Sequence, residues 1–372
     1  MIKYIGSKRA LIPWIGGGIR AIGESDAELS RRPHAEIRIL EPFAGSCRVG
    51  YEMKRQGFFV IAGDYLSFSY ILARTFIEAD RRDYPPERIW PILQRLQALP
   101  GEEDWFVQRY ACEARYFQPA NAQKIAAIRK AIPTEAKGDS LLEAILLTSL
   151  LLAADKVDST TGLQMAYLKE WAPRSYNPLT LEYPSLLPGK GLAYVGDALE
   201  KAHTFAADIA YLDPPYNQHS YAGNYHVWET LVRYDNPPVY GVAVKRADVR
   251  KLRSPFNSKK EAPRALHRLL QALQARYVVL SFSDEGYFTP EELLQLCNQR
   301  GPTLVLERTH KRYIGAQIGI YNPRGERVGQ VSHTQNREFL YVIAPDGHAY
   351  QGLQAALQQK ALSPSGGQAK LF

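Results

Sequence analysis

The segment Ala207–Asn217 holds the residues whose types and order point most directly to chemistry. Its apolar run Ile209–Leu212 stops at Asp213–Tyr216, which is one acid, two prolines and one tyrosine. The run predicts a buried strand, and the prolines end it because each fixes φ and lacks a backbone donor. Beyond such a strand end, the Asp213 carboxylate and a proline carbonyl can accept both N–H bonds of an exocyclic amine while the Tyr216 ring stacks on the ring that carries the amine. The alternative is a strand-ending turn whose acid caps a helix.

A second small-residue segment, Glu41–Gly50, follows another predicted strand and precedes a predicted helix. Small residues at such a turn let a ligand approach the backbone closely. The segment lacks the full glycine pattern of a dinucleotide-binding turn and the lysine of a phosphate-binding loop. A nucleotide-type ligand loop and a simple tight turn are therefore equal alternatives.

Two further acids stand at strand ends. Asp64 ends the strand that follows Glu41–Gly50, where an acid can accept hydrogen bonds from a ribose diol. Asp197 comes shortly before the strand that leads to Asp213, where it could accept from an adenine amino group. A solvated carboxylate at Asp64 and a plain turn at Asp197 are the alternatives.

The elements that must position these residues alternate along the chain. Short runs rich in β-branched and aromatic residues predict strands over Ile37–Phe43, Phe58–Asp64, Ile209–Leu212, Tyr277–Phe282, Leu304–Glu307 and Phe339–Ile343. Helical patterns cover Arg48–Gln56, Phe68–Arg81, Tyr225–Arg233, Ala262–Ala275 and Pro290–Arg300. Strands alternating with helices predict an α/β fold with a mainly parallel sheet.

One long interruption separates the second strand from the third. Residues 83–188 contain no convincing strand but several helical runs, namely Glu87–Leu99, Trp105–Tyr116 and Ser140–Lys156. Such a length is far beyond an ordinary connection. We therefore expect a mostly helical insert at 83–188, a catalytic domain formed by 1–82 and 189–344, and a C-terminal helix and flexible tail at 345–372.

Bulk properties are those of a soluble globular protein. The 372 residues are 45% hydrophobic and 23% charged, and 46 Lys plus Arg against 38 Asp plus Glu give a net charge of +8. This excess favours a polyanionic partner without proving one. The three cysteines are far apart, which suggests neither zinc nor disulfides, and a cytoplasmic location without a membrane span is expected.

Together, these segments resemble in order the D12 class of N6-adenine-specific DNA methyltransferases, the group that includes Dam and the modification methylases of FokI type. The resemblance covers roughly residues 1 to 344. Its segments are Lys3–Lys8, Glu41–Gly50, Asp64, Asp197, Asp213–Tyr216, Asn224–Leu231, Phe256–Lys260, Leu280–Gly286 and Arg337–Tyr341.

The resemblance implies a Rossmann-like, S-adenosylmethionine-dependent methyltransferase sheet with an inserted, mostly helical DNA-recognition lobe. It implies cofactor contacts from the N-terminal motif, from the turn after the first strand and from strand-end acids. These residues are Tyr4, Lys8, Pro42, Phe43, Gly45, Asp64, Asp197 and Asp213. Cys47 departs from the family pattern, which usually closes this turn with glycine, so close backbone approach there is in doubt.

It also implies that Asp213, Pro214 and Tyr216 are catalytic. The N6 lone pair of adenine is delocalised into the ring, so the amine is a poor nucleophile. If the Asp213 carboxylate and the Pro214 carbonyl accept both N6 protons, the nitrogen can pyramidalise and attack the sulfonium methyl group. Tyr216 would stack on an adenine flipped out of duplex DNA. No metal is required.

Basic clusters after the catalytic strand are candidate phosphate contacts, although charge runs are often only solvated faces. The predicted DNA contacts are Lys245, Arg246, Lys259, Lys260, Lys311 and Arg312. Base reading is expected from the insert, where polar side chains follow its apolar helix. These are Lys156, Thr160, Thr161, Gln164, Lys169, Arg174 and Asn177.

The chain closes with Gln368–Phe372 after a flexible linker, and this end resembles peptides that dock into the bacterial sliding clamp through residues equivalent to Gln368, Leu371 and Phe372. An unremarkable disordered terminus is the alternative. For the whole chain, the alternatives to a DNA methyltransferase are a ribosomal RNA base methyltransferase and a catalytically silent DNA-binding regulator.

Overall fold

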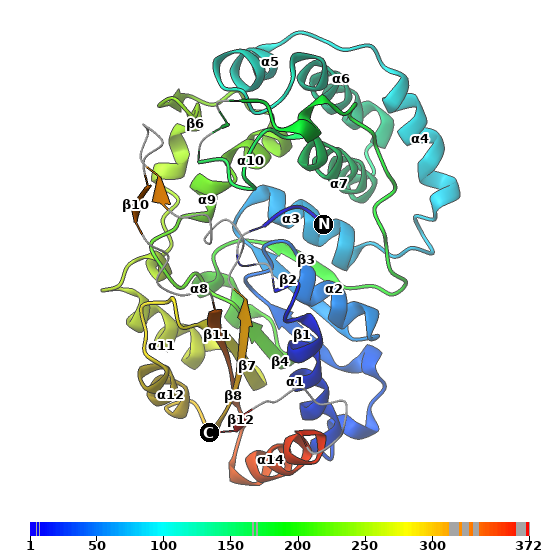
Figure 1. Ribbon diagram of the computed structural model, residues 1–372. Coiled ribbons are helices and arrows are strands. Elements are labelled where there is room, and N and C mark those ends of the chain that lie inside the picture. Colours follow the sequence, from blue (N-terminus) through cyan, green and yellow to red (C-terminus); the bar gives the residue numbers. More distant parts are fainter. Residues whose placement is uncertain are drawn as a thin grey trace. The chain divides into compact units, whose positions relative to one another are not determined.

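The computed structural model describes residues 1–4, 6, 8–165, 167–168, 170–311, 320–321, 327–329, 335–361 and 370–371 (Figure 1). The chain forms two compact units, each made of three segments that are distant in sequence. Unit 1 comprises Met1–Pro13, His34–Ala202 and His219–Ser254. Unit 2 comprises Trp14–Pro33, His203–Gln218 and Pro255–Phe372.

Unit 1 contains three parallel strands, β1 (Arg38–Glu41), β2 (Phe59–Asp64) and β3 (Leu192–Val195), with β2 in the middle. The connection from β1 to β2 is the helix α2 (Arg48–Arg55). Because all three strands run in the same direction, their carboxyl ends meet at one edge. Glu41 pairs with Ala62 and Asp64 pairs with Val195, which brings the predicted ligand turn and both predicted acids to that edge.

The remainder of unit 1 is largely helical. After α3 (Ser67–Ala73) and the π-helical turn η3 (Arg74–Glu78), the helices α4 (Pro86–Ala98), α6 (Pro119–Ala136) and α7 (Ser140–Val157) gather into one group (Figure 1). Helix α7 is buried around most of its circumference, as its nearly continuous apolar sequence requires. No strand occurs among the described residues of 83–188. The assignment of this segment as a separate recognition insert stays a prediction.

Smaller elements complete unit 1. They are η2 (His34–Glu36), α5 (Trp105–Val107), η4 (Gln108–Glu113), η5 (Pro173–Tyr176), α8 (Ala198–Lys201), α9 (Tyr221–Asn224), α10 (His226–Arg233), β5 (Val239–Tyr240), β6 (Lys245–Arg246) and η7 (Ala247–Arg250). Strands β5 and β6 pair antiparallel as a hairpin. Most of these elements are therefore helical turns of only a few residues.

Unit 2 contains the strand that leads to Asp213. Strand β4 (Ala207–Leu212) is parallel to β7 (Ala275–Ser283), whereas β11 (Gln335–Ile343) lies antiparallel between β7 and β8 (Thr303–Lys311). Its helices are α1 (Ile12–Ser25), α11 (Ala262–Ala272), α12 (Pro290–Asn298) and α14 (Gly347–Ala361). The short elements are η1 (Leu29–Arg31), η6 (Ala202–Thr204, beginning at the unit boundary), η8 (Pro255–Asn257), β9 (Ile320–Tyr321), β10 (Arg327–Gly329) and β12 (Lys370–Leu371).

Helices between mostly parallel strands confirm the predicted α/β, Rossmann-like fold class. All six predicted strands are present, with β8 and β11 longer than expected. Helix α1, helix α6 and strand β3 were missed. The signal for α6 was available, because Ile125, Ile128 and Ile132 recur at helical spacing and are buried.

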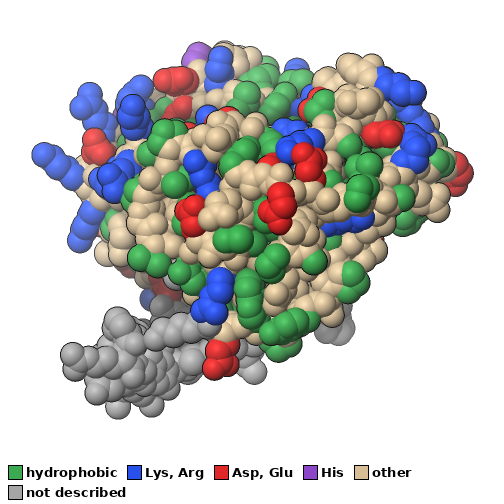
Figure 2. Space-filling view, turned by 90° about the horizontal axis from the view of Figure 1, so that it is seen from above, with side chains coloured by type: hydrophobic (Ala, Val, Ile, Leu, Met, Phe, Trp, Pro, Cys, Tyr) green, Lys and Arg blue, Asp and Glu red, His purple; other side chains and the backbone are tan. Residues whose placement is uncertain are grey.

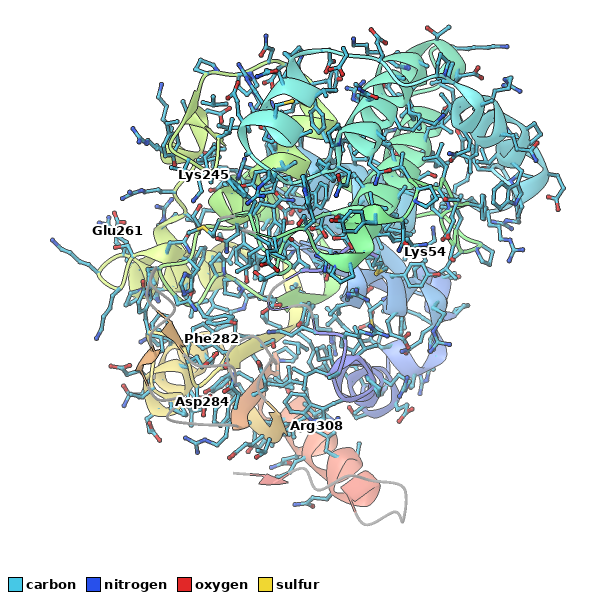
Figure 3. All side chains as sticks on the ribbon, turned by 45° about the horizontal axis from the view of Figure 1, so that its top comes forward. Lys54, Lys245, Glu261, Phe282, Asp284 and Arg308 are labelled. Carbon is cyan, nitrogen blue, oxygen red and sulfur yellow. The ribbon has the colours of Figure 1, made fainter. Side chains whose placement is uncertain are left out.

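The predicted helix Phe68–Arg81 is wrong at its end, since the helical turns stop at Glu78. Lys54 of α2 explains the stop: its buried ammonium donates to Ile77 O at 2.7 Å and to Ala79 O at 2.6 Å (Figure 3 labels Lys54). These bonds satisfy carbonyls at a helix end. Burial lowers the pKa of Lys54 to about 8, although Asp80 and Glu78 oppose this shift. No helix in the described part of the chain is both long and apolar enough to cross a bilayer.

Candidate functional site

The turn between β1 and α2 depends on two residues in the left-handed region, Gly45 at φ +50° and Cys47 at φ 60°. A Cβ added to Gly45 would lie 3.0 Å from Cε1 of Tyr4, so glycine lets this ring pack on the turn. Cys47 therefore sits where the family usually has glycine and has the backbone conformation that glycine adopts most readily. Burial, with the charges of Glu41 and Asp64, raises the pKa of the Cys47 thiol well above its usual value. Such a thiol stays protonated and inert.

Asp64 ties the turn after β1 to the end of β2. Its carboxylate accepts from the backbone N–H of Gly45 at 2.8 Å and from that of Leu66 at 3.0 Å. Burial raises the pKa of Asp64 to about 6, while these backbone donors act in the opposite direction. Asp64 therefore shapes the turn in addition to offering an acceptor at the strand end.

Asp197 lies just beyond β3, the neighbour of β2. Its carboxylate accepts from the backbone N–H of Leu199 at 2.7 Å and so caps α8. The backbone N–H of Gly196 donates to the carbonyl of Asp64 at 3.1 Å, which holds the two strand ends together. The capping role is structural, and the predicted ligand role of Asp197 stays a prediction.

The other predicted cofactor residues of unit 1 have different degrees of exposure. Lys8 and Pro42 are buried, and Phe43 is half-buried. Tyr4 is also half-buried and lies in an aromatic stack that the sequence did not predict. Its ring is 4.7 Å from that of Tyr225 and 5.3 Å from that of Tyr221, nearly parallel to both. The four-residue spacing of the two partners, at the start of helical segments, was the available signal.

The N-terminal segment is anchored by Lys3. Its backbone N–H donates to the Asp155 carboxylate at 3.0 Å, and its ammonium donates to Asp158 at 2.7 Å and to the Asp155 carbonyl. Burial raises the pKa of Asp155 to about 6, against the attraction of Lys3. The residue next to Tyr4 is thus fastened to the end of α7.

The predicted catalytic residues follow β4 in unit 2. Pro214 is buried, whereas Asp213 and Tyr216 are half-exposed. Strand β4 is buried over its last four residues, so the chain leaves the protein interior at Asp213, as the sequence predicts. The structure therefore places the carboxylate and the tyrosine ring at the carboxyl end of a buried parallel strand.

The loop after β7 braces this tetrapeptide. The backbone N–H of Tyr287 donates to the Tyr216 carbonyl at 3.0 Å, and the Phe282 ring meets the Tyr216 ring edge-on with centroids 5.9 Å apart (Figure 3 labels Phe282). A Cβ on Gly286 would lie only 2.2 Å from Cε1 of Phe282, so the loop needs glycine there. At the start of the loop, the Asp284 carboxylate accepts a hydrogen bond from the backbone N–H of Arg337 at 3.2 Å.

Asn257 supports the same segment from η8. Its amide donates to the carbonyl of Asn217 at 2.9 Å, and the Tyr287 hydroxyl donates to the Asn257 carbonyl at 3.0 Å. The segment Phe256–Lys260 therefore meets the catalytic segment through the hydrogen bond of Asn257, and Leu280–Gly286 meets it through the ring of Phe282. Tyr287 was not singled out from the sequence.

The predicted DNA contacts have different environments. Lys259 and Lys260 are exposed and Lys245 is half-exposed. Figure 2 shows many Lys and Arg side chains standing out from the surface with fewer acidic ones between them. Arg246, by contrast, is fully buried and pairs with Asp235 at 2.6 Å and Asp248 at 2.7 Å. A phosphate contact would require these ion pairs to break, so Arg246 serves the interior of the hairpin.

Several polar residues expected to read bases are also internal. Thr160 and Gln164 are buried, and Arg174 pairs with Asp158 at 2.6 Å. The interpretation of Thr160 and Gln164 as exposed reading groups is therefore wrong, because the protein itself satisfies their polar atoms. Thr161 and Asn177 are exposed, and Lys156 pairs with Glu182 at 2.6 Å.

Some predicted residues cannot be compared. Arg312, Lys169, Gln368 and Phe372 lie outside the described residues, and for Lys311 and Leu371 only the backbone is described. In that description, Leu371 pairs with Leu306 as part of β12. Clamp binding by the tail stays a prediction. Within the described residues, no group of three or more His, Cys, Asp or Glu side chains is arranged to hold a metal ion.

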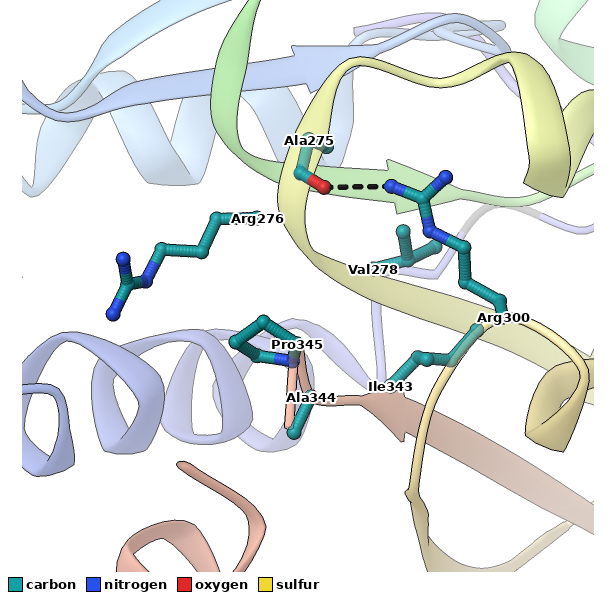
Figure 4. Close-up of a pocket in the computed structure, with 7 residues that line it drawn as sticks. All are labelled: Ala275, Arg276, Val278, Arg300, Ile343, Ala344 and Pro345. Atoms are coloured by element: carbon teal, nitrogen blue, oxygen red, sulfur yellow. Dashed lines mark hydrogen bonds between the residues drawn. The ribbon is translucent and has the colours of Figure 1, made fainter. Parts of the chain in front are cut away.

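A pocket of about 240 Å³ lies at the amino-terminal end of β7 (Figure 4). Arg300, one of its lining residues, donates to the carbonyls of Leu270 at 2.8 Å, Leu273 at 3.0 Å and Ala275 at 2.8 Å. Its guanidinium therefore caps the end of α11. The pocket contains none of the predicted site residues, and Phe282 belongs to the opposite end of the same strand.

Comparisons with known proteins show which proteins the chain is similar to. The chain is 30% identical over 312 residues to the modification methylase StsI of Streptococcus sanguinis, which covers 80% of this chain and 46% of that protein. It is 28% identical over 352 residues to the type II methyltransferase M.NlaIII of Neisseria lactamica, covering 92% and 98%.

It is also 30% identical over 329 residues to the type II methyltransferase M.FokI of Planomicrobium okeanokoites, covering 84% of this chain and 48% of that protein. The chain thus spans about half the length of two of these relatives and nearly all of the third. Residues 4–294 match the family of D12 class N6 adenine-specific DNA methyltransferases. The chain belongs to the D12 class of N6 adenine-specific DNA methyltransferases.

Proposed function

We propose that the protein transfers a methyl group from S-adenosylmethionine to N6 of an adenine in duplex DNA, at a specific site. The observation that carries the proposal is the end of β4, where Asp213, Pro214 and Tyr216 leave a buried strand and are braced by the loop after β7. Family membership supplies the reaction class. The named relatives are modification methylases and type II methyltransferases, so a modification role is part of the proposal.

The residues of unit 1 fit S-adenosylmethionine. Gly45 leaves no Cβ between the turn and the Tyr4 ring, and Asp64 presents a carboxylate at the end of the central strand β2. We assign the ribose to Asp64, the adenine amino group to Asp197 and the methionine part to Tyr4 and Lys8, with Pro42 and Phe43 completing the set from unit 1. The contact of Asp213, in unit 2, with the cofactor stays a prediction. When bound, the cofactor supplies an electrophilic sulfonium methyl group.

Asp213 and Pro214 activate the target amine. The carboxylate and the carbonyl each accept one N6 proton, which favours a pyramidal nitrogen with an available lone pair. The same acceptors stabilise the positive charge that develops on nitrogen during attack. Pro214 is buried and is followed by Pro215, and because proline restricts its own φ and the residue before it, the backbone that carries the Pro214 carbonyl has little freedom. In the transfer, the amine would gain the methyl group and release one proton to solvent, and the donor would leave as the neutral thioether S-adenosylhomocysteine.

Tyr216 positions the base. Its ring is half-exposed, and the Phe282 edge and the Tyr287 backbone N–H restrict its movement. Stacking on adenine requires that the base leave the duplex, which costs a few kcal/mol. Lys245, Lys259 and Lys260 would contact phosphates and contribute affinity without sequence information. We expect this reaction on cellular DNA to take place in the cytoplasm.

Transfer of tritiated methyl groups from S-adenosylmethionine to duplex DNA and to RNA tests the proposal. We expect label in duplex DNA and loss of label in Asp213→Ala. Labelling of ribosomal RNA alone would favour the RNA base methyltransferase. Unchanged adenine methylation by Asp213→Ala would show that this tetrapeptide is not catalytic. The protein as a catalytically silent DNA-binding regulator would then be the alternative again.

A further inference from the structure

Two neighbouring surface segments of unit 1 expose large apolar side chains. The first, formed by the described residues of 161–176, is called the recognition loop below, and the second, residues 241–244, is the tip of the β5–β6 hairpin. Val242 is 80% exposed, Tyr176 is 68% exposed and Met165 is 48% exposed. Exposed apolar groups concentrated on adjacent segments indicate a contact surface.

The two segments lie side by side. The Tyr116 hydroxyl is 2.9 Å from the Gln164 carbonyl and 3.1 Å from the Ala243 carbonyl, so a single buried group holds both. At the surface, Lys245 Nζ lies 3.3 Å from Met165 Sδ (Figure 3 labels Lys245). The part of the recognition loop around Met165 and the hairpin tip are therefore neighbours at the surface.

Buried polar groups fix the recognition loop from beneath. The Gln164 side chain accepts from the backbone N–H of Val227 at 2.8 Å, and its backbone N–H donates to Asn224 O at 2.8 Å. His226 Nε2 lies 2.9 Å from the Gln164 carbonyl, and burial lowers the pKa of His226 to about 3, so the ring is neutral. The loop is thus attached to α9 and α10, which follow the catalytic segment in the chain.

The hairpin tip is fixed as firmly and is strained. Arg246 fastens its base through Asp235 and Asp248. Val244 has φ 49°, a conformation that is a genuine outlier for a β-branched residue, and Gly241 has φ 68°. Strain of this kind persists only where surrounding structure imposes it, and it concentrates at functional segments. The fold therefore holds Val242 out from the surface.

Basic and aromatic side chains border the apolar groups. The Arg115 guanidinium lies 5.9 Å from the Tyr167 ring and 5.8 Å from the Trp171 ring, and Lys245 adjoins Met165. Glu170 is the acidic residue of the loop. Apolar groups can meet thymine methyls and base edges, while cations meet phosphates. This combination fits a nucleic-acid duplex better than an uncharged partner.

We propose that the recognition loop around Met165 and the hairpin tip together form the surface that reads bases of duplex DNA, with Val242 and Met165 as its specificity-determining contacts. This inference rests on the proposed function. It assigns base reading to exposed apolar side chains and assigns anchoring to Gln164, Arg174 and Arg246.

The test is the double variant Val242→Ser with Met165→Ser, compared with Trp90→Ser. Trp90 is 42% exposed on α4, outside both segments, so it controls for loss of an exposed apolar side chain. The methylated site is first mapped by sequencing DNA from cells that express the wild type. Fluorescence anisotropy then measures binding of a duplex with that site, and sequencing of a methylated random-site library measures base preference.

For the double variant we expect at least a roughly tenfold weaker affinity for the site duplex, and relaxed preference at one or more positions. S-adenosylmethionine affinity and thermal unfolding should match the wild type, as both should in Trp90→Ser. Affinity and base preference equal to those of Trp90→Ser would overturn the inference. If the wild type binds duplex DNA without methylating it, the proposed function fails. The same variants are then compared for binding to a random-sequence duplex, and weaker binding of the double variant than of Trp90→Ser would still support this surface as a DNA contact.

Discussion

At the scale of single residues, Asp64 and Cys47 determine the character of the turn after β1. Asp64 fastens Gly45 in place and has a pKa raised to about 6 by burial. Cys47 closes the turn at φ 60° although it carries a Cβ. Sequence reasoning identified both positions. It could not give the acidity of Asp64 or the conformation of Cys47, because each arises from neighbours that the fold brings together.

The acidity of Asp64 predicts pH-dependent cofactor binding. The ionised carboxylate is the stronger acceptor for ribose hydroxyls, and it is lost as pH falls through about 6. We therefore expect S-adenosylmethionine affinity to be constant above pH 7 and to fall by up to about tenfold per pH unit below 6. Isothermal titration calorimetry from pH 5 to 8 measures the affinity for S-adenosylmethionine at each pH.

Two variants identify the titrating group. Asp64→Asn should bind more weakly and show little pH dependence. Asp155 also has a pKa raised to about 6, so Asp155→Asn is the control and should keep the wild-type pH profile. A pH profile that disappears in Asp155→Asn and persists in Asp64→Asn would contradict the assignment.

The left-handed backbone of Cys47 predicts an unusual tolerance for glycine. Cys47→Gly should leave the free energy of unfolding within about 1 kcal/mol, since relief of strain offsets the lost burial. Cys47→Val should destabilise by about 1–3 kcal/mol because a β-branched residue tolerates this conformation poorly. Cys297→Val, at a buried helical cysteine, controls for side-chain size in urea unfolding. Equal losses at both positions would show that backbone conformation is not the cause.

At the scale of elements, the loop after β7 acts as a template for the catalytic segment. Gly286 lets the loop close over Phe282, and Phe282 in turn meets the Tyr216 ring. Phe282 also packs edge-on against Phe288, with ring centroids 5.5 Å apart. The loop therefore connects the close contact between Gly286 and Phe282 to the Tyr216 ring, which would stack on adenine.

Gly286→Ala should displace Phe282, because its Cβ would overlap that ring. We expect kcat to fall by about tenfold to a hundredfold through misplacement of Tyr216, with S-adenosylmethionine affinity unchanged. Gly23→Ala in α1 is the matched control, since a Cβ there meets no atom within 4 Å. Steady-state methylation kinetics on a duplex that contains the recognised site measures kcat for both variants. A wild-type kcat in Gly286→Ala would mean that the brace does not position the ring.

Prediction from sequence succeeded best where one residue type has a single physical meaning. The prolines after Leu212 marked the end of β4, and the apolar run of α7 marked a buried helix. It failed for Thr160, Gln164 and Arg246, because the sequence does not show whether a polar or basic side chain is exposed to water or bonded to a buried partner. Their partners come from α10, Asp158, Asp235 and Asp248, and only the fold reveals them.

At the scale of the whole molecule, the net charge of +8 favours a polyanion. Many of the cations are already paired, as Arg246 and Arg174 illustrate. Those that remain exposed, such as Lys259 and Lys260, are better placed for phosphates. Composition alone therefore overstates how much positive charge reaches DNA.

Salt dependence of DNA binding tests this account of charge. Neutralising two phosphate contacts in Lys259→Ala with Lys260→Ala should weaken affinity similarly for all sequences. It should also reduce the slope of log affinity against log salt by about two. Lys190→Ala, at another exposed lysine, should leave the slope unchanged. Equal slopes for the double variant and the wild type would remove these lysines from the interface.

The most direct test of the central claim is nucleoside mass spectrometry of DNA from cells that express the wild type or Asp213→Ala. We predict N6-methyldeoxyadenosine in DNA from the wild type, and its loss in Asp213→Ala at equal protein levels. The absence of N6-methyldeoxyadenosine from wild-type DNA, or its persistence in Asp213→Ala, would contradict adenine methylation by this tetrapeptide.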